Sequence, residues 1–138
     1  MRIVVNSDRI FAALIRKSKC REIILSEKFE FLTVDFARKE IQEHVGEILR
    51  KTGLSLNEVE TILGILFKSI SIVNDAVIKK KYKNARKIMD HIDPNDTPFI
   101  ALALSVENEG IWTEDKHFMK QKRIRIWKTI ELMDLIRD

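Results

Sequence analysis

Four carboxylates in this chain of 138 residues stand where they could hold a divalent cation. Asp8 and Asp115 each follow an expected strand, and Asp96 opens an expected helix. Glu40 lies inside a further helix, at the edge of its apolar face rather than opposite it. Mg²⁺ and Mn²⁺ prefer oxygen ligands of this kind. One or two such ions can activate water and stabilise the leaving oxygen in phosphodiester hydrolysis, which is the chemistry that these residues predict.

Each of these carboxylates also has an ordinary structural explanation. Asp8, Asp96 and Asp115 could each cap a helix or a short turn, because aspartate is common at that position. Glu40 could pair with a neighbouring Lys or Arg, since an unpaired carboxylate beside apolar side chains is costly. The metal site is therefore a hypothesis about the four positions taken together, and it requires a fold that brings them to one place.

Short strands alternate with amphipathic helices along the whole chain. Strands are expected over residues 2–5, 29–34, 69–73, 111–113 and 124–127. Helices are expected over residues 35–50 with Gly53 after the end, from the Ser55–Glu58 capping box onward, around 82–92, from Thr97 to Glu109 with Gly110 as the end, and over 130–136. Strands separated by helices form a mostly parallel sheet covered on both faces. In such an α/β fold the functional edge lies at the carboxyl ends of the strands.

The composition is that of one folded domain over residues 1–138. The 25 Lys and Arg residues exceed the 21 Asp and Glu residues by four, which is a weak positive field for a polyanionic partner. A single cysteine, Cys20, cannot form an intramolecular disulfide and fits a reducing compartment. The apolar run over residues 99–104 is far shorter than the roughly 18 residues of a membrane span. We therefore expect a soluble, cytoplasmic protein with no membrane segment.

Missing motifs exclude several other kinds of active site. The chain has no glycine-rich phosphate loop and no GxSxG nucleophile motif. Asn6-Ser7-Asp8 after the first strand lacks the first carboxylate of an Asp-x-Asp phosphatase motif. The three histidines and the one cysteine are too scattered to predict a zinc site. Chemistry based on carboxylates remains.

Four segments, taken in order, resemble the motifs of PIN domains. They are Val4-Val5-Asn6-Ser7-Asp8, Glu40-Ile41, the segment from Asp93 to Leu104, and Trp112-Thr113-Glu114-Asp115. The third segment, followed closely by Trp-Thr-x-Asp, is the most specific, and the resemblance spans essentially the whole chain. It implies a three-layer α/β/α fold with an acidic pocket that binds Mg²⁺ or Mn²⁺ and cleaves RNA.

The resemblance also assigns roles by position. It implies that Glu40, Asp96 and Asp115 are catalytic, and that Asp96 and Asp115 bind the metal. The first motif departs from the family, which usually has Asp-Ser/Thr-Asn where this chain has Asn6-Ser7-Asp8. Asn6 could ligate a cation without contributing charge, which would lower the affinity. Asp8 could replace it as a ligand or could face solvent.

Substrate contacts are expected beside the carboxylates. Ser7 would be a polar neighbour of the ion, or a simple turn residue. Three lysines follow the last carboxylate and would bind phosphates in a salt-sensitive manner: Lys116, Lys120 and Lys122. A second run of cations, over residues 79–87, crowds one helix, and runs of this kind more often form a solvated helix face.

Partners follow from the resemblance. RNA is the expected substrate. Many small members of the family are VapC-like toxins held by an antitoxin, and many dimerise. The resemblance therefore implies an antitoxin as one candidate partner and a homodimer or higher homo-oligomer, with contacts through the helices over residues 35–68.

Two functions stay open at this point. The first is a metal-dependent endoribonuclease, which would be the toxin of a toxin–antitoxin pair. The second is a catalytically attenuated module of the same fold that binds RNA or a protein without cutting it, and Asn6 is the reason to keep it. Cleavage of DNA is not excluded by the sequence.

Overall fold

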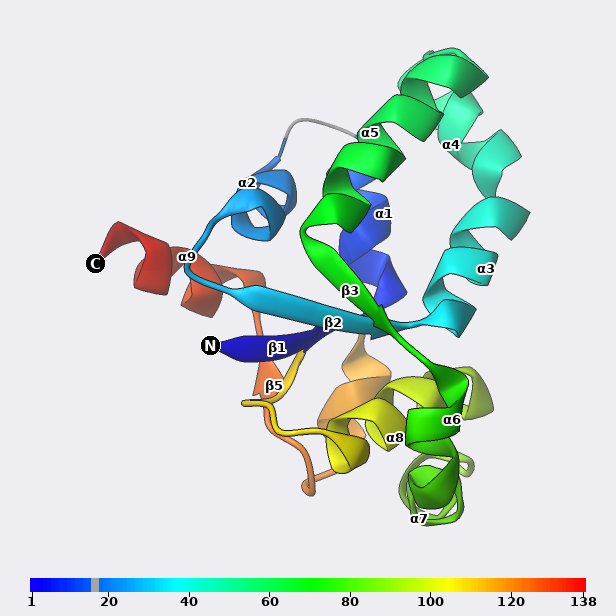
Figure 1. Cartoon of the computed structure of the whole chain (residues 1–138), viewed down its shortest axis with the longest axis vertical. Coiled ribbons are helices and arrows are strands. Elements are labelled where there is room, and N and C mark those ends of the chain that lie inside the picture. Colours follow the sequence, from blue (N-terminus) through cyan, green and yellow to red (C-terminus); the bar gives the residue numbers. More distant parts are fainter. Residues whose placement is uncertain (16–17) are drawn as a thin grey trace.

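Five short parallel strands form the centre of the protein (Figure 1). They lie within residues 1–15 and 18–138, the part of the chain that the computed structural model describes. In chain order the strands are β1 (Arg2–Val5), β2 (Glu30–Val34), β3 (Ile70–Val73), β4 (Ile111–Trp112) and β5 (Ile126–Trp127). The sheet has the order β3-β2-β1-β4-β5, and every neighbouring pair is parallel. The expectation of about five mostly parallel strands is confirmed.

Helices occupy the connections between the strands. The α-helices are α1 (Ser7–Ile15), α2 (Lys19–Leu25), α3 (Asp35–Glu43), α4 (Val45–Thr52), α5 (Leu56–Lys68), α6 (Asp75–Ile78), α7 (Tyr82–Met89), α8 (Thr97–Ser105) and α9 (Thr129–Arg137). The 3₁₀ helices are η1 (Lys79–Lys81), η2 (Pro94–Asp96) and η3 (Lys116–Lys120). Among the helices of the described residues, none has both the length and the apolar composition that crossing a bilayer requires.

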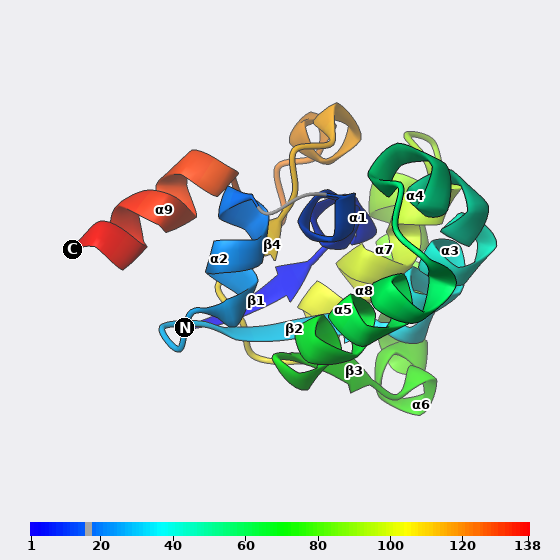
Figure 2. The ribbon, with the colours of Figure 1, turned by 90° about the horizontal axis from the view of Figure 1, so that it is seen from above.

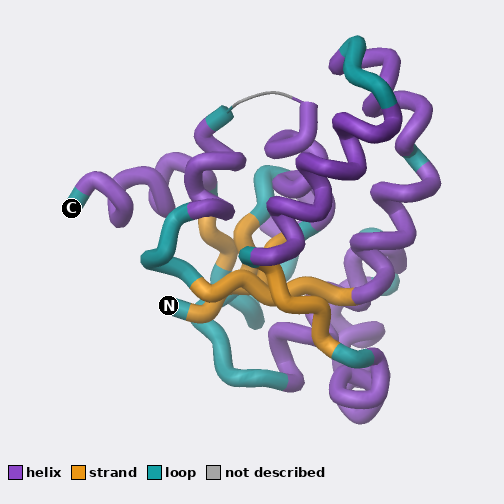
Figure 3. Tube along the Cα trace, turned by 45° about the horizontal axis from the view of Figure 1, so that its top comes forward, coloured by secondary structure: helices purple, strands orange, loops and turns teal. Residues whose placement is uncertain are grey.

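Strand side chains are buried on both faces of the sheet, which explains the two helical layers. On β1, Ile3 and Val5 belong to one core, and Val4 belongs to the other. Strands buried on both sides are typical of parallel sheets. The first core includes residues of α1, α2, α4, α5 and α9, and the second includes residues of α6, α7 and α8. Figure 3 shows helices on both sides of the strands, and the predicted three-layer α/β/α fold is confirmed.

The strand order places a topological switch at β1. The chain passes from β1 to β2 and then to β3 on one side, and it returns to β4 on the other side of β1. Val5 pairs with Trp112, so the segments that follow β1 and β4 leave the sheet next to each other. Figure 2 shows β1 leading directly into α1. Ligands of open parallel sheets bind at the carboxyl ends of strands at such a switch, which makes this edge the expected functional one.

The long helix expected over residues 35–50 is two helices, and the prediction was wrong at His44. The backbone there has φ −106° and ψ 16°, so α3 ends and α4 begins on either side of it. The His44 imidazole Nδ1 lies 2.8 Å from the carbonyl oxygen of Glu40. A side chain that competes for a helix carbonyl favours such a break. The predicted end at Gly53 and the Ser55–Glu58 capping box are confirmed.

The helix expected from Thr97 to Glu109 ends earlier, at Ser105. Asn108 accounts for this, because its side-chain amide donates hydrogen bonds to the carbonyl oxygens of Ala103 and Val106, at 2.8 Å each. Gly110 therefore does not cap the helix. It adopts φ +128°, and a Cβ there would collide with the carbonyl oxygen of Arg125 on the neighbouring β5 segment. Gly110 is needed for this close approach of the backbone.

Further elements differ from the sequence-based expectation. Strand β5 covers Ile126–Trp127 rather than residues 124–127. Helix α2 was not predicted, although Cys20, Ile23 and Ile24 bury one of its sides. A helix of seven residues shows too little of its period in the sequence to be recognised.

Candidate metal centre

Two aspartates are placed by the turn that leads into α8. Asp93 precedes η2, and its Oδ1 accepts a hydrogen bond from the backbone N–H of Asn95 at 3.0 Å. Asp96 is the residue before α8, a helix whose residues are almost all buried. Because α8 must pack into the second core, the carboxylate at its start is buried with it and is only 7% exposed. Packing of the largely apolar helix α8 thus buries the carboxyl group of Asp96.

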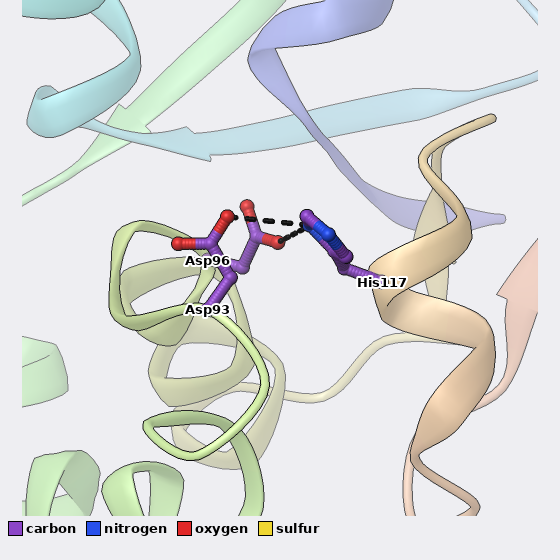
Figure 4. Close-up of side chains that lie close together, drawn as sticks. All are labelled: Asp93, Asp96 and His117. Carbon is purple, nitrogen blue, oxygen red and sulfur yellow. Dashed lines mark ion pairs between the residues drawn. The ribbon is translucent and has the colours of Figure 1, made fainter.

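His117 reaches the same point from η3, on the opposite side. Its Nδ1 lies 3.2 Å from Oδ2 of Asp93, 3.6 Å from Oδ2 of Asp96 and 3.4 Å from Oδ1 of Asp115. Figure 4 shows the imidazole and the carboxylates of Asp93 and Asp96 pointing toward one another. Ligand atoms of Asp93, Asp96 and His117 all lie within 4.8 Å of one another, close enough to share one ion.

Two of these ligand atoms are buried without a hydrogen-bond partner among the described residues. They are Oδ2 of Asp96 and Nδ1 of His117. Leaving a buried polar atom unpaired costs about 1–3 kcal/mol, so such atoms indicate a missing partner. A divalent cation between them would satisfy both, and carboxylate and imidazole are ordinary ligands of divalent metals. The residues present therefore fit a metal ion.

Further carboxylates surround the centre and change its electrostatics. The pKa of Asp96 is raised to about 7. Burial is the largest cause, and the negative charges of the nearby carboxylates contribute in the order Asp115, Asp93, Glu40 and Asp8. This influence requires the carboxylates to be near one another in a poorly solvated place. The structure thus gathers the four predicted carboxylates around one edge of the sheet. Their roles in catalysis stay predictions.

Glu40 is held in position by Ser7. The Ser7 hydroxyl donates a hydrogen bond of 2.8 Å to Oε1 of Glu40. Partial burial raises the pKa of Glu40, and the Ser7 hydrogen bond opposes the rise. Ser7 is buried and its hydroxyl is bound to Glu40, while its predicted contact with substrate stays a prediction. This position gives it a structural task at the site, namely orienting a carboxylate.

Asn6 and Asp8 are both tied to Thr113, which follows β4. The Asn6 amide donates to Oγ1 of Thr113 at 3.0 Å, and the Thr113 hydroxyl donates to Oδ1 of Asp8 at 3.1 Å. The second Asp8 oxygen accepts from the backbone N–H of Glu114 at 3.0 Å and from Arg9 at 3.1 Å. Both Asp8 oxygens are thus engaged by the protein, and Arg9 balances the charge.

The structure therefore distributes the predicted site residues unequally. Asp96 and Asp115 lie in the cluster, Glu40 lies beside it, and Asn6 and Asp8 join the two strand ends. The predicted phosphate-binding lysines are exposed on or next to η3: Lys116, Lys120 and Lys122. The contact of these lysines with substrate stays a prediction.

Sequence reasoning missed His117 and gave Asp93 no role. The three histidines lie too far apart in the sequence to predict a shared zinc site, and this spacing hides His117 as a ligand beside carboxylates. The signal that could have found His117 is its spacing from Asp115: the backbone N–H of His117 donates to Oδ1 of Asp115 at 2.9 Å, so the turn brings both side chains to one side.

A comparison with protein families gives one match. A family model described as a PIN domain matches residues 4–134, which includes the end of β1, the strands β2 to β5, the Asp93–Asp96 turn and η3. No curated protein matches the chain.

The raised pKa of Asp96 predicts a pH-dependent stability of the metal-free protein. Its folded-state pKa of about 7 lies above the ordinary 3.8, so the folded state holds a proton that the unfolded state has lost between these values. Stability contributed by this proton is present at low pH and is lost as the pH rises toward 7. Each unit of difference corresponds to about 1.4 kcal/mol. Compared with Asp96→Asn, the wild type should lose roughly 3 kcal/mol between about pH 5 and pH 8.

Urea unfolding in EDTA measures this effect. Asp134→Asn, an exposed carboxylate on α9, is the matched control and should follow the wild-type pH profile. If Asp96→Asn and the wild type show parallel profiles, Asp96 does not hold the extra proton.

Proposed function

The chain belongs to the PIN domain family, and from this premise we propose that it is a metal-dependent endoribonuclease that acts at the Asp93, Asp96 and His117 centre. PIN domains are typically metal-dependent nucleases. The observation that carries the proposal for this chain is a pair of buried atoms, Oδ2 of Asp96 and Nδ1 of His117, that have no hydrogen bond within the described residues. They lie at the sheet edge where parallel folds bind their ligands.

Different residues of the centre would have different roles in hydrolysis. Asp93, Asp96 and His117 would hold a divalent ion, with Asp115 at its side. A bound ion of this kind supplies Lewis acidity, which activates water and stabilises the leaving oxygen of a phosphodiester. Glu40 would accept the proton of the attacking water, because Ser7 binds one of its oxygens and leaves the other available. The water oxygen bonds to phosphorus, the phosphorus–oxygen bond to the leaving group breaks, and solvent protonates the leaving oxygen.

His117 bears on which metal the centre prefers. Mg²⁺ binds almost entirely through oxygen, whereas imidazole suits transition metals such as Mn²⁺ better. A site with one imidazole and two carboxylates should therefore favour Mn²⁺ over Mg²⁺. The sequence-based prediction left these two ions open, and we propose Mn²⁺.

A second candidate function is the attenuated module, and Asn6 is the observation that favours it. Asn6 is buried beside the centre and spends its amide on Thr113, while its Oδ1 accepts from the backbone N–H of Ser7 at 2.9 Å. No negative charge stands at this position. A centre with one charge fewer binds a cation more weakly. The protein would then bind RNA or a partner without cutting efficiently.

We also propose that the protein has a protein partner. Helix α5 exposes two large apolar side chains, Leu56 and Ile65, each 47% exposed. They support a protein contact on the α3–α5 side, either with an antitoxin, as in a toxin–antitoxin pair, or with a second copy of the chain.

Hydrolysis of a labelled single-stranded RNA tests the main proposal. With Mn²⁺ the wild type should cut the RNA, and EDTA should stop it. Asp96→Asn and Asp115→Asn should each lose about 100-fold in rate, because they remove a charge at the ion. Asp134→Asn should cut normally. A wild type that cuts neither RNA nor a matched DNA in Mn²⁺ would overturn the nuclease function, and cutting of DNA alone would overturn the RNA specificity.

Metal titration followed by thermal unfolding tests the preference for Mn²⁺. The wild type should be stabilised at lower Mn²⁺ than Mg²⁺ concentrations, since ligands that bind only the folded state raise Tm. His117→Gln should weaken Mn²⁺ binding about tenfold or more and leave Mg²⁺ binding nearly unchanged. His91→Gln, an exposed histidine at the end of the α7 segment, is the control. Equal Mn²⁺ affinity in His117→Gln and the wild type would remove His117 from the ligand set.

Asn6→Asp separates the enzyme from the attenuated module. Restoring a carboxylate at this position should tighten Mn²⁺ binding about tenfold and raise the cutting rate. A silent wild type with an active Asn6→Asp variant identifies the attenuated module. Mn²⁺ affinity that stays constant or falls in the variant would contradict the importance of charge at position 6.

A further inference from the structure

A groove of about 850 Å³ lies next to the metal centre, between α3, the α6–α7 segment and the start of α8. We call it the α3–α7 groove. Its base is apolar, because Val34, Ile78 and Pro98 are buried there. Its walls carry Phe36, Lys39, Asp75, Ala76, Lys79, Tyr82, Lys83 and Arg86. Binding sites for small organic molecules typically have about 300–1,000 Å³, so the groove has room for roughly one or two nucleotides.

Four cations line this groove against one carboxylate. The cations are Lys39, Lys79, Lys83 and Arg86, and the carboxylate is Asp75. Lys39 has an ion pair with Asp35 at 3.5 Å, and this contact is largely exposed. Within residues 1–15 and 18–138, the other three cations have no carboxylate within 4.0 Å. Unpaired cations that converge on a hollow attract a polyanion.

Aromatic side chains stand between the cations. Tyr82 and Phe36 are both half-buried and line the groove. The Arg86 guanidinium carbon lies 5.1 Å from the centre of the Tyr82 ring, so a flat cationic group and a ring form one surface. Nucleic acids supply what fits this mixture, since phosphates bind the cations and unpaired bases stack on rings and on guanidinium planes.

The groove and the metal centre are built from neighbouring residues of two segments, α3 and the start of α8. Lys39 lines the groove, and Glu40, the next residue of α3, lies beside the centre. Pro98 is at the base of the groove, and Asp96, two residues before it, is in the centre. Neighbouring Cα atoms are only about 3.8 Å apart. The groove therefore begins within one or two residues of the carboxylates, both along α3 and at the start of α8.

We infer that the α3–α7 groove binds a single-stranded segment of nucleic acid next to the phosphate that is cut. This inference rests on the proposed nuclease function, because it assigns the groove to the same substrate. The bases of a duplex are stacked inside it and cannot reach Tyr82 or Phe36, so the segment is single-stranded. The basic residues over 79–87 lie on η1 and α7, and by themselves they are typical of a solvated helix face. One side of this segment lines the α3–α7 groove, and the other side does not.

Two matched triple variants test the groove. The first removes the three unpaired cations of the groove: Lys79→Gln, Lys83→Gln and Arg86→Gln. The control removes three exposed cations of the same segment that do not line it: Lys80→Gln, Lys81→Gln and Lys87→Gln. Both variants change the net charge equally. Binding of a fluorescein-labelled 12-nucleotide RNA is measured by anisotropy in EDTA, and circular dichroism checks that both variants are folded.

The groove variant should bind the RNA about tenfold or more weakly than the wild type, while the control should change by less than about threefold. Each lost phosphate contact lowers the slope of log K against log salt by about 0.7, so the groove variant should lose roughly two units of slope. Equal losses in the two variants, or no loss in the groove variant, would overturn the inference.

A DNA oligonucleotide of the same sequence identifies the source of the recognition. Binding of DNA as tight as that of RNA supports recognition through phosphates and bases, and binding of RNA alone supports it through the 2′-hydroxyl as well. Because EDTA removes the metal, the measurement does not depend on catalysis. A protein that binds in the groove but never cuts would contradict the proposed nuclease and leave the groove in place, whereas a protein that cuts normally after loss of the groove cations would contradict the groove alone.

Discussion

The burial of Asp96 is the constraint on which the site depends. Helix α8 is apolar on nearly every side and fills the second core, so its first turn cannot be moved outward without unpacking that core. The carboxylate at its start is consequently held among other carboxylates in a place with little water. Repulsion between them is relieved either by a proton on Asp96 or by a cation. The raised pKa of Asp96 and its unpartnered oxygen are two expressions of this same arrangement.

Thr113 explains how the altered first motif keeps its shape. Its hydroxyl accepts from Asn6 and donates to Asp8, and it also accepts from the backbone N–H of Asp115. One side chain thus fastens the end of β1 to the end of β4. The negative charge of Asn6-Ser7-Asp8 lies at Asp8, where Arg9 pairs with it, and position 6 carries none.

The edge of the sheet is also organised by charge. Carboxylates gather where β1 and β4 end, and cations gather in the neighbouring α3–α7 groove, three of them with no carboxylate within 4.0 Å among residues 1–15 and 18–138. Lys39 lines the groove and the adjacent Glu40 lies beside the metal centre, because successive side chains on a helix point about 100° apart. The small net charge of the whole chain does not reveal that carboxylates and cations lie in separate places, since local fields depend on where charges lie and not on their sum.

Local pattern in the sequence was enough for the strands, for most of the helices and for the family, because periodic burial and the order of the motifs are properties of neighbouring residues. It also placed Asp96 and Asp115 at element ends, where a parallel sheet brings its functional groups. Other features depend on contacts between distant segments. His117 became a candidate ligand only when η3 folded against the Asp93–Asp96 turn, and Ser7 met Glu40 across 33 positions of the chain. Gly110 is required by the carbonyl of Arg125, which no local rule could reveal. The sequence by itself determined which residues could carry charge and where the chain turns, and the tertiary structure alone decided which charges face one another, because electrostatic and packing energies depend on distance in space.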